Sequence, residues 1–339
     1  MKMPSTNLNV FKGSFFSLLS FMFGIALLLL LFFFIQPASV FASFEKISLW
    51  QFGFIFALRL IFWTLGVLKW KIILDFYQQK VSFWKLYLFK FAAFSVSYFT
   101  PITAVGGQAV GVILLKNEKV PTKIGITTML IDSVLTPFVS VTISLFALVL
   151  FLLIKFSSTP FLILAFFTLF SVILFLSLFF IVFSIHKPIP EKFKLKVWQK
   201  WKSALKDFLF IFSDFFRKNK KGALYLVVLS FFGHVSILLE IFLILYFLGI
   251  SLDVIELAIV EAGYTFAFII PVSQALGTAE AAGAYTLQAL GHGAALGISL
   301  TLILRIRHLL AGLIGIAVLI FYGLAVFVYN KGYNKGSIR

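Results

Sequence analysis

Residues 15–35 of the chain have the sequence FFSLLSFMFGIALLLLLFFFI, which contains no charged side chain. A second uncharged run, PFLILAFFTLFSVILFLSLFFIVFSI, occupies residues 160–185. A helix of about 20 apolar residues crosses the hydrocarbon core of a bilayer, so each run is long enough to span a membrane. The whole chain is 61% hydrophobic and 12% charged, whereas soluble proteins are about half apolar and about a quarter charged. The composition excludes an ordinary water-soluble globule and predicts an all-α polytopic membrane protein.

The apolar runs predict six full membrane spans in a single integral membrane domain covering residues 1–339. We place these spans near residues 14–35, 47–68, 122–153, 160–185, 222–248 and 298–329. The first could instead belong to a signal peptide, because Val40-Phe41-Ala42 resembles a cleavage site. Its apolar region is longer than that of a typical signal, so we expect a retained first span.

The net charge of +17 is concentrated in one segment rather than spread along the chain. Between Lys187 and Lys221 lie eleven Lys or Arg and three Asp or Glu, a net charge of +8. Such a segment between spans is typical of a cytoplasmic loop and of contact with anionic lipids, so nucleic acid is not an expected partner. The bases avoid the expected outer loops, which predicts that both chain ends are cytoplasmic. Residues 191–217 and 69–80 are amphipathic and predict helices that lie on the membrane surface.

Two further apolar segments are interrupted by proline and glycine. Residues 84–120 contain Pro101, Gly106 and Gly107, and residues 257–297 contain Pro271 and Gly277. Charge and parity favour a re-entrant helical hairpin in each segment, although two complete crossings of the first segment are an alternative. Irregular backbone at membrane depth requires cover by protein or a water-filled cavity, and paired interruptions point to a transporter's binding site.

The two interrupted segments are spaced like the two halves of a repeat. Pro101 and Pro271 lie 170 residues apart, as do Gly107 and Gly277. We therefore consider an inverted repeat of residues 1–186 and 222–330, with chance similarity in a low-complexity sequence as the alternative.

Ionisable side chains inside predicted spans are costly and mark candidate functional positions. They are Arg59, Asp132, His234, Glu240, Glu261, Glu280, Arg305, Arg307 and His308. Arg305 and Arg307 directly follow the second hairpin, and two guanidinium groups at that depth require carboxylates or an anionic ligand such as phosphate. Two interpretations stay open. One is an anionic headgroup site, aided by the amides of a helix that begins near Thr278. The other is an Arg–Glu pair that holds the hairpin in place.

Two stretches resemble the signatures of a known family. The first runs from Tyr98 through Pro101, Gly106 and Gly107 to Asp132, and the second comprises Gln274–Glu280 and Arg305–Gly312. Both resemble the flippase-like transmembrane region of lysylphosphatidylglycerol synthases, and within that family the subgroup associated with hopanoid biosynthesis. The likeness extends over about residues 10–330. It implies a helical membrane protein that handles lipids, with Glu280, Arg305 and Arg307 at the second hairpin matching the pattern.

The chain departs from the family pattern at the first hairpin. The family usually places an acidic residue after the Gly-Gly pair and an arginine three positions later, where this chain has Gln108 and Gly111. The usual proline corresponds to Ser273, and here Pro271 precedes it. The synthases also carry a soluble aminoacyl-transfer domain, and the longest polar stretch of this chain is a basic loop of 35 residues. Aminoacyl transfer is therefore not expected.

The leading hypothesis is a lipid transporter of the inner membrane, with membrane lipids and lipid-biosynthesis proteins as partners. The alternatives are a non-catalytic member of a lipid-biosynthesis complex and a membrane-embedded headgroup transferase, in which Glu280 and His308 would form the acid–base pair. We expect no enzyme activity, cofactor or metal, because the four histidines lack metal-ligand spacing. Glu261 and Glu240 are candidates for ion coupling. The residues predicted to bind substrate are Arg305, Arg307, His308, Glu280, Gly277, Pro271, Pro101, Gly106, Gly107, Gln108 and Asp132.

Overall fold

The computed structural model describes residues 45–99, 103–155, 212–268, 270 and 272–336, together with positions 22, 26, 33 and 42. Over the described ranges the secondary structure is helical and contains no strand, as the sequence predicts. The elements are α3 (Leu49–Phe76), α4 (Phe83–Phe99), α5 (Thr103–Asn117), α6 (Thr122–Lys155), α9 (Lys220–Phe247), α10 (Val254–Ala267), the 3₁₀ turn η1 (Ser273–Ala275), α11 (Thr278–Ala289) and α12 (Ala294–Gly336).

Four of the described helices are long and apolar enough to cross a membrane. They are α3, α6 up to Ile154, α9, and α12 from Ala294 to Tyr322. These helices correspond to four of the predicted spans. The other two predicted spans, 14–35 and 160–185, lie outside the described residues, and so does most of the amphipathic segment 191–217. Large apolar side chains such as Phe231 and Phe232 are exposed on the helices, which suits a surface that faces lipid.

The predicted surface helix at residues 69–80 is wrong, because α3 continues without interruption to Phe76. Ile73 and Leu74 are fully buried, and Lys69 is only 4% exposed. The apolar residues of this stretch pack against α4, α5 and α6 instead of lipid headgroups. Lys69 can lie inside the bundle because a carboxylate from α6 faces it there.

Each interrupted segment contains two short helices with a break between them. The first pair, α4 and α5, has 17 and 15 residues, and the second pair, α10 and α11, has 14 and 12 residues. At 1.5 Å per residue these helices are about 18 to 26 Å long, shorter than the hydrocarbon core of about 30 Å. The helix α11 begins at Thr278, where the sequence places a helix start.

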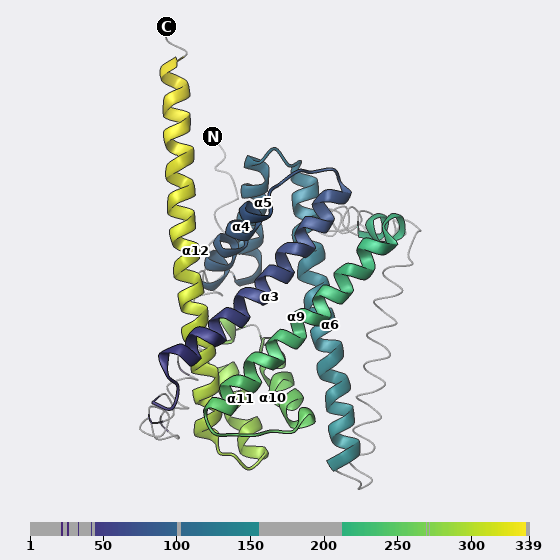
Figure 1. Ribbon diagram of the computed structural model, residues 1–339, viewed down its shortest axis with the longest axis vertical. Helices are drawn as coiled ribbons and strands as arrows, with labels where there is room; N and C mark the ends of the chain where they lie inside the picture. Colours follow the sequence, from purple (N-terminus) through teal and green to yellow (C-terminus); the bar gives the residue numbers. More distant parts are fainter. Residues whose placement is uncertain are drawn as a thin grey trace, which may run out of the picture.

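The helices follow the same order twice: long, short, short, long. The elements of the set α3 to α6 and those of the set α9 to α12 begin 171 to 175 residues apart. The helix α4 packs against α12, and its counterpart α10 packs against α6, the counterpart of α12. The first helices of the two sets, α3 and α9, pack against each other. Corresponding helices therefore make corresponding contacts. Figure 1 shows α4 and α5 toward one end of the bundle and α10 and α11 toward the other. The order and packing of the described helices therefore agree with the repeat considered from the sequence.

Glycines allow the short helices to approach their neighbours closely. A Cβ at Gly297 of α12 would lie 2.0 Å from the carbonyl oxygen of Gly283 in α11, and one at Gly107 of α5 would lie 2.2 Å from that of Ala93 in α4. Small residues at such crossings bring two backbones into van der Waals contact, the usual basis of tight helix packing in membranes. The glycines therefore allow α11 to lie directly against α12, and α5 directly against α4.

Candidate functional site

The break between α10 and α11 is held to α12 by Arg305. Its guanidinium forms an ion pair with Glu280 through Nε and Oε1, and its Nη2 donates to Glu280 Oε2 at 2.9 Å. The same group donates to the carbonyl oxygens of Ala275 at 2.9 Å and of Gln274 at 3.4 Å. The Arg–Glu interpretation from the sequence therefore describes the contact that Arg305 makes in the structure.

The backbone at this break requires such support. Gln274 and Ala275 have φ angles of 51° and 50°, a left-handed conformation that non-glycine residues rarely adopt. Gly277, with φ of 78°, precedes α11, and its N–H donates to Glu280 Oε2 at 2.8 Å. The Gln274 side chain also donates from Nε2 to the carbonyl oxygen of Ser97 in α4 at 2.5 Å. The turn of the second short-helix pair thus contacts the end of a helix from the first pair.

Arg307 faces a different set of partners. It forms an ion pair with Glu240 of α9, and both side chains are only 2% exposed. Its Nη2 lies 2.6 Å from His308 Nε2, which also lies 3.2 Å from Arg59 Nη2 of α3. Since guanidinium nitrogens only donate, His308 Nε2 acts as an acceptor and the imidazole is neutral. We call Arg305, Arg307, His308 and their carboxylate partners the junction cluster.

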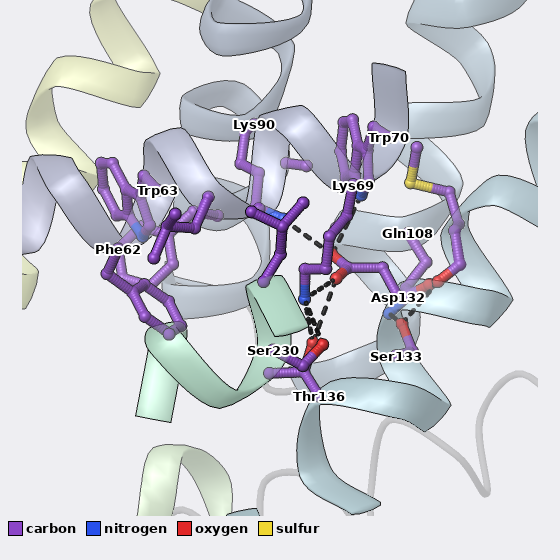
Figure 2. Close-up of a pocket in the computed structure, with 18 of the residues that line it drawn as sticks. Phe62, Trp63, Lys69, Trp70, Lys90, Gln108, Asp132, Ser133, Thr136 and Ser230 are labelled. Carbon is purple, nitrogen blue, oxygen red and sulfur yellow. Dashed lines mark hydrogen bonds and ion pairs between the residues drawn. The ribbon is translucent and has the colours of Figure 1, made fainter. Parts of the chain in front are cut away.

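A second group of charged side chains surrounds Asp132 of α6 (Figure 2). Lys69 Nζ lies 2.6 Å from Oδ1 of Asp132, and Lys90 Nζ lies 2.7 Å from Oδ2. Trp70 Nε1 donates to the same carboxylate at 2.9 Å and Thr136 Oγ1 at 3.1 Å. Lys90 also lies 4.6 Å from the centroid of the Trp70 ring, within cation–π range. We call Lys69, Trp70, Lys90, Asp132 and Thr136 the Asp132 cluster.

The Asp132 cluster borders a cavity of about 300 Å³ between α3, α4, α5, α6 and α9. Its lining also includes Arg59, Gln108, Ser133 and the aromatic rings of Phe62 and Trp63. Gly66 makes room for Lys90, since a Cβ there would lie 2.5 Å from the lysine nitrogen. The volume is at the lower end of those that hold small ligands.

A third buried acid, Glu261 of α10, has only hydroxyl and imidazole partners among the described residues. Ser144 Oγ donates to Oε2 at 2.9 Å, and Thr265 Oγ1 donates to Oε1 at 2.5 Å. His234 Nε2 lies 3.6 Å from Oε2, and His234 Nδ1 lies 3.1 Å from Ser140 Oγ. His234 and Glu240 therefore have separate partners, as their spacing predicts.

The predicted substrate-binding residues divide between these groups. The junction cluster contains Arg305, Arg307, His308 and Glu280, with Gly277 next to it, whereas Asp132, Gln108 and Gly107 line the cavity. Gly106 lies beside Gly107 in α5. Pro101 and Pro271 lie outside the described residues. Arg59 is within contact distance of His308 and also lines the cavity, so it links the two groups.

Sequence reasoning missed Lys69 and Lys90. Lys69 stands at the end of an apolar run beside Lys71, so it resembled a loop residue, and Lys90 lies within the first interrupted segment. The available signal was that nine consecutive uncharged residues follow Lys90 within an apolar helix. That signal is the same one that identified Arg59 and Asp132.

Comparison with protein families gives one match over most of the chain. The model described as the lysylphosphatidylglycerol synthase TM region matches residues 18–327. The chain belongs to this family. The resemblance to this family that was inferred from the two signatures is thereby confirmed, whereas the match does not test the hopanoid-associated subgroup. The chain is a multi-pass membrane protein related to lipid-handling proteins. Among curated proteins, none matches the chain. In this family member, Glu280 and Arg305 of the second signature form an ion pair at the turn between α10 and α11, and Arg307 pairs with Glu240 of α9.

Proposed function

We propose that the chain is a flippase-like transporter that moves an amphipathic lipid, an anionic phospholipid or an isoprenoid of the hopanoid type, between the leaflets of the inner membrane. The observation that carries this proposal is the contact of the two short-helix pairs, from opposite ends of the bundle, beside a charged interior with a cavity. A headgroup crossing a membrane must be shielded from hydrocarbon, and interrupted helices at mid-depth are where transporters place such sites.

Charge bias along the chain supports a specific orientation of this bundle. With both chain ends cytoplasmic, α4 and α5 would enter as a re-entrant hairpin from the cytoplasm, and α10 and α11 from the opposite side. The short lengths of these four helices favour re-entry over full crossing. Each hairpin would then give access to the interior from one leaflet.

Transport without chemistry is the function that the side-chain contacts favour. A headgroup transferase would require a free acid and base near each other, and Glu280 and His308 were the candidates. Glu280 instead binds Arg305, and His308 contacts Arg59 and Arg307. These contacts argue against an acid–base pair, so we propose that the chain is not an enzyme.

Coupling to a proton is proposed at Glu261. Its carboxylate faces no lysine or arginine among the described residues, and we propose that a proton on Glu261 itself or on His234 balances its negative charge. Glu240, the other candidate for ion coupling, is already balanced by Arg307. Of the two candidates for ion coupling, we therefore propose Glu261 as the proton carrier.

The test is lipid translocation by purified protein in liposomes that contain a fluorescent phospholipid. A membrane-impermeant reductant bleaches only the labelled lipid in the outer leaflet. A protein that flips lipid brings the labelled lipid of the inner leaflet to the outer leaflet, where it is bleached as well. We expect Gln274→Ala, which removes the contact with Ser97, to slow this exposure several-fold, and the exposed Gln288→Ala in the same hairpin to leave it unchanged. Bleaching that stops at the outer leaflet, as in empty liposomes, would refute transport.

A further inference from the structure

The cavity bordered by the Asp132 cluster has an excess of positive charge. Its lining contains three cations, Arg59, Lys69 and Lys90, and one carboxylate, Asp132. Both lysines contact Asp132, which can balance only one of them. Arg59 lies 4.3 Å from the Phe62 ring centroid and contacts His308, but among the described residues no carboxylate pairs with it. The surplus is two positive charges.

No other described carboxylate of the bundle interior can balance this surplus. Glu280 and Glu240 are each bound by an arginine of α12, and Glu261 is held by hydroxyls of α6 and α10. Buried charge without a counter-charge is unfavourable, and more so in a membrane than at a surface. A negatively charged occupant of the cavity would remove that cost.

The cavity also offers a hydrogen-bond acceptor. Ser133 Oγ donates to the carbonyl oxygen of Met129 at 2.8 Å, so it can only accept from Gln108 Nε2. This fixes the orientation of the Gln108 amide and leaves its Oε1 buried without a hydrogen-bond partner among the described residues. Gln108 Oε1 therefore requires a donor from the occupant.

Cations and one unpaired acceptor, Gln108 Oε1, together define one ligand chemistry. We propose that this cavity binds a phosphate that carries a neighbouring hydroxyl group, with Arg59 and Lys90 on the phosphate oxygens and Gln108 Oε1 on the hydroxyl. Guanidinium and ammonium groups suit phosphate, and a volume of about 300 Å³ suits a small headgroup such as glycerol phosphate. If the ligand is a lipid headgroup, this inference rests on the proposed transport function. If the ligand is a free polyol phosphate, it does not.

The binding site therefore differs from the one expected from the sequence. Arg305 and Arg307 were the predicted anion ligands, but Glu280 and Glu240 already balance their charges. The cations with capacity for a ligand lie on α3 and α4 instead. Gln108 of the lining is a neutral amide, so it adds no negative charge to the cavity.

Calorimetric titration of the purified full chain in detergent tests the site without requiring transport. Short-chain phosphatidylglycerol is compared with short-chain phosphatidylcholine, with phosphatidylpropanol, which lacks the hydroxyls, and with free glycerol phosphate. We expect phosphatidylglycerol to bind at least tenfold more tightly than phosphatidylcholine. Arg59→Gln and Lys90→Gln should each weaken its binding about tenfold or more, since a charged hydrogen bond contributes about 1.5–3 kcal/mol.

Lys85→Gln is the matched control, because Lys85 lies on the same helix but pairs with Glu118 outside the cavity. If Lys90→Gln does not fold, Gln108→Leu replaces it, and this variant should bind phosphatidylglycerol and phosphatidylpropanol equally. Equal binding of phosphatidylcholine and phosphatidylglycerol by the wild type, or unchanged binding by Arg59→Gln, would overturn the proposal. Binding of glycerol phosphate as tight as that of the lipid would support the site and contradict the proposed lipid transport. Lipid flipping without headgroup preference would refute the site alone.

Discussion

Several charged side chains in the bundle interior form ion pairs with a partner from a different helix. Lys69 and Glu240 illustrate this, because each is the twenty-first residue of a 28-residue helix, α3 in one set and α9 in the other. Lys69 binds Asp132 of α6, and Glu240 binds Arg307 of α12. The two sets therefore place an ion pair between equivalent helices, with the signs of the charges reversed.

Removing one partner of such a pair should be costly. Glu240→Gln leaves Arg307 buried without a counter-charge, and we expect a loss of about 3–5 kcal/mol in unfolding free energy. Combining Glu240→Leu with Arg307→Met should recover most of that loss. Thermal unfolding in detergent micelles measures both effects.

The control for this prediction is Lys71→Met, which breaks an exposed pair with Asp75 whose side chains are 32% and 52% exposed. It should change stability by no more than about 1 kcal/mol. A Glu240→Gln variant as stable as the control would contradict the buried pair.

Asp132→Asn gives a prediction that depends on the cavity. The substitution removes the only carboxylate of the lining and raises its surplus to three positive charges, so the unfolding temperature should fall. Anionic short-chain lipid should restore part of the loss, because a ligand that binds the folded state stabilises it. The measurement is the unfolding temperature with phosphatidylglycerol or phosphatidylcholine added. Equal recovery with both lipids would show that the added negative charge does not enter the cavity.

Among the elements, the short helices owe their positions to backbone contacts as much as to side chains. The carbonyl of Gly283 contacts the backbone at Gly297, so α11 and α12 touch where neither has a side chain. The N-terminal end of α11 is held to α12 by Arg305. The second short-helix pair is thus attached to α12 at two separate points.

Gly297→Ala should disturb this attachment, because its Cβ would lie 2.0 Å from the carbonyl oxygen of Gly283. Overpacking of this kind costs about 1–3 kcal/mol, measured as a lower unfolding temperature. Gly53→Ala is the matched control in α3, since no atom lies within 4 Å of the added carbon. An alanine there should stabilise the helix by about 0.5–1 kcal/mol. Equal effects of the two substitutions would argue against the close crossing.

The elements were predicted from sequence more completely than the site. Long apolar runs located α3, α6, α9 and α12 because hydrocarbon imposes length and composition directly. The end of α3 was missed because Lys69 and Trp70 resemble an interfacial belt, and only the buried Asp132 explains why they lie inside. The pairing of Arg305 with Glu280 was one of two open interpretations. The choice between them depended on tertiary contacts, which no local pattern contains.

The two short-helix pairs lie toward opposite ends of the bundle (Figure 1). In the proposed orientation the loop before α4 faces the cytoplasm, and the loop before α10 faces the other side of the membrane. The chain contains no cysteine, so single introduced cysteines report sidedness without background.

Two exposed positions test this orientation: Lys80→Cys before α4 and Ser251→Cys before α10. In intact cells with a permeabilised outer barrier, a membrane-impermeant maleimide should label Ser251→Cys and not Lys80→Cys. Inside-out vesicles should give the opposite result. Labelling of both variants from the same side would refute entry of the two hairpins from opposite faces.

The bonds of Arg305 have a further consequence for which residues position 305 tolerates. Four of the five N–H groups of its guanidinium are in use, two toward the carboxylate of Glu280 and two toward the carbonyls of Gln274 and Ala275. A lysine has three N–H groups that radiate from one nitrogen, so it would keep the charge and still leave a carbonyl without a donor. Arg305 thus supplies hydrogen-bond donors to backbone carbonyls between α10 and α11. Arg305→Lys would conserve the charge but would disrupt the backbone conformation at Gln274 and Ala275.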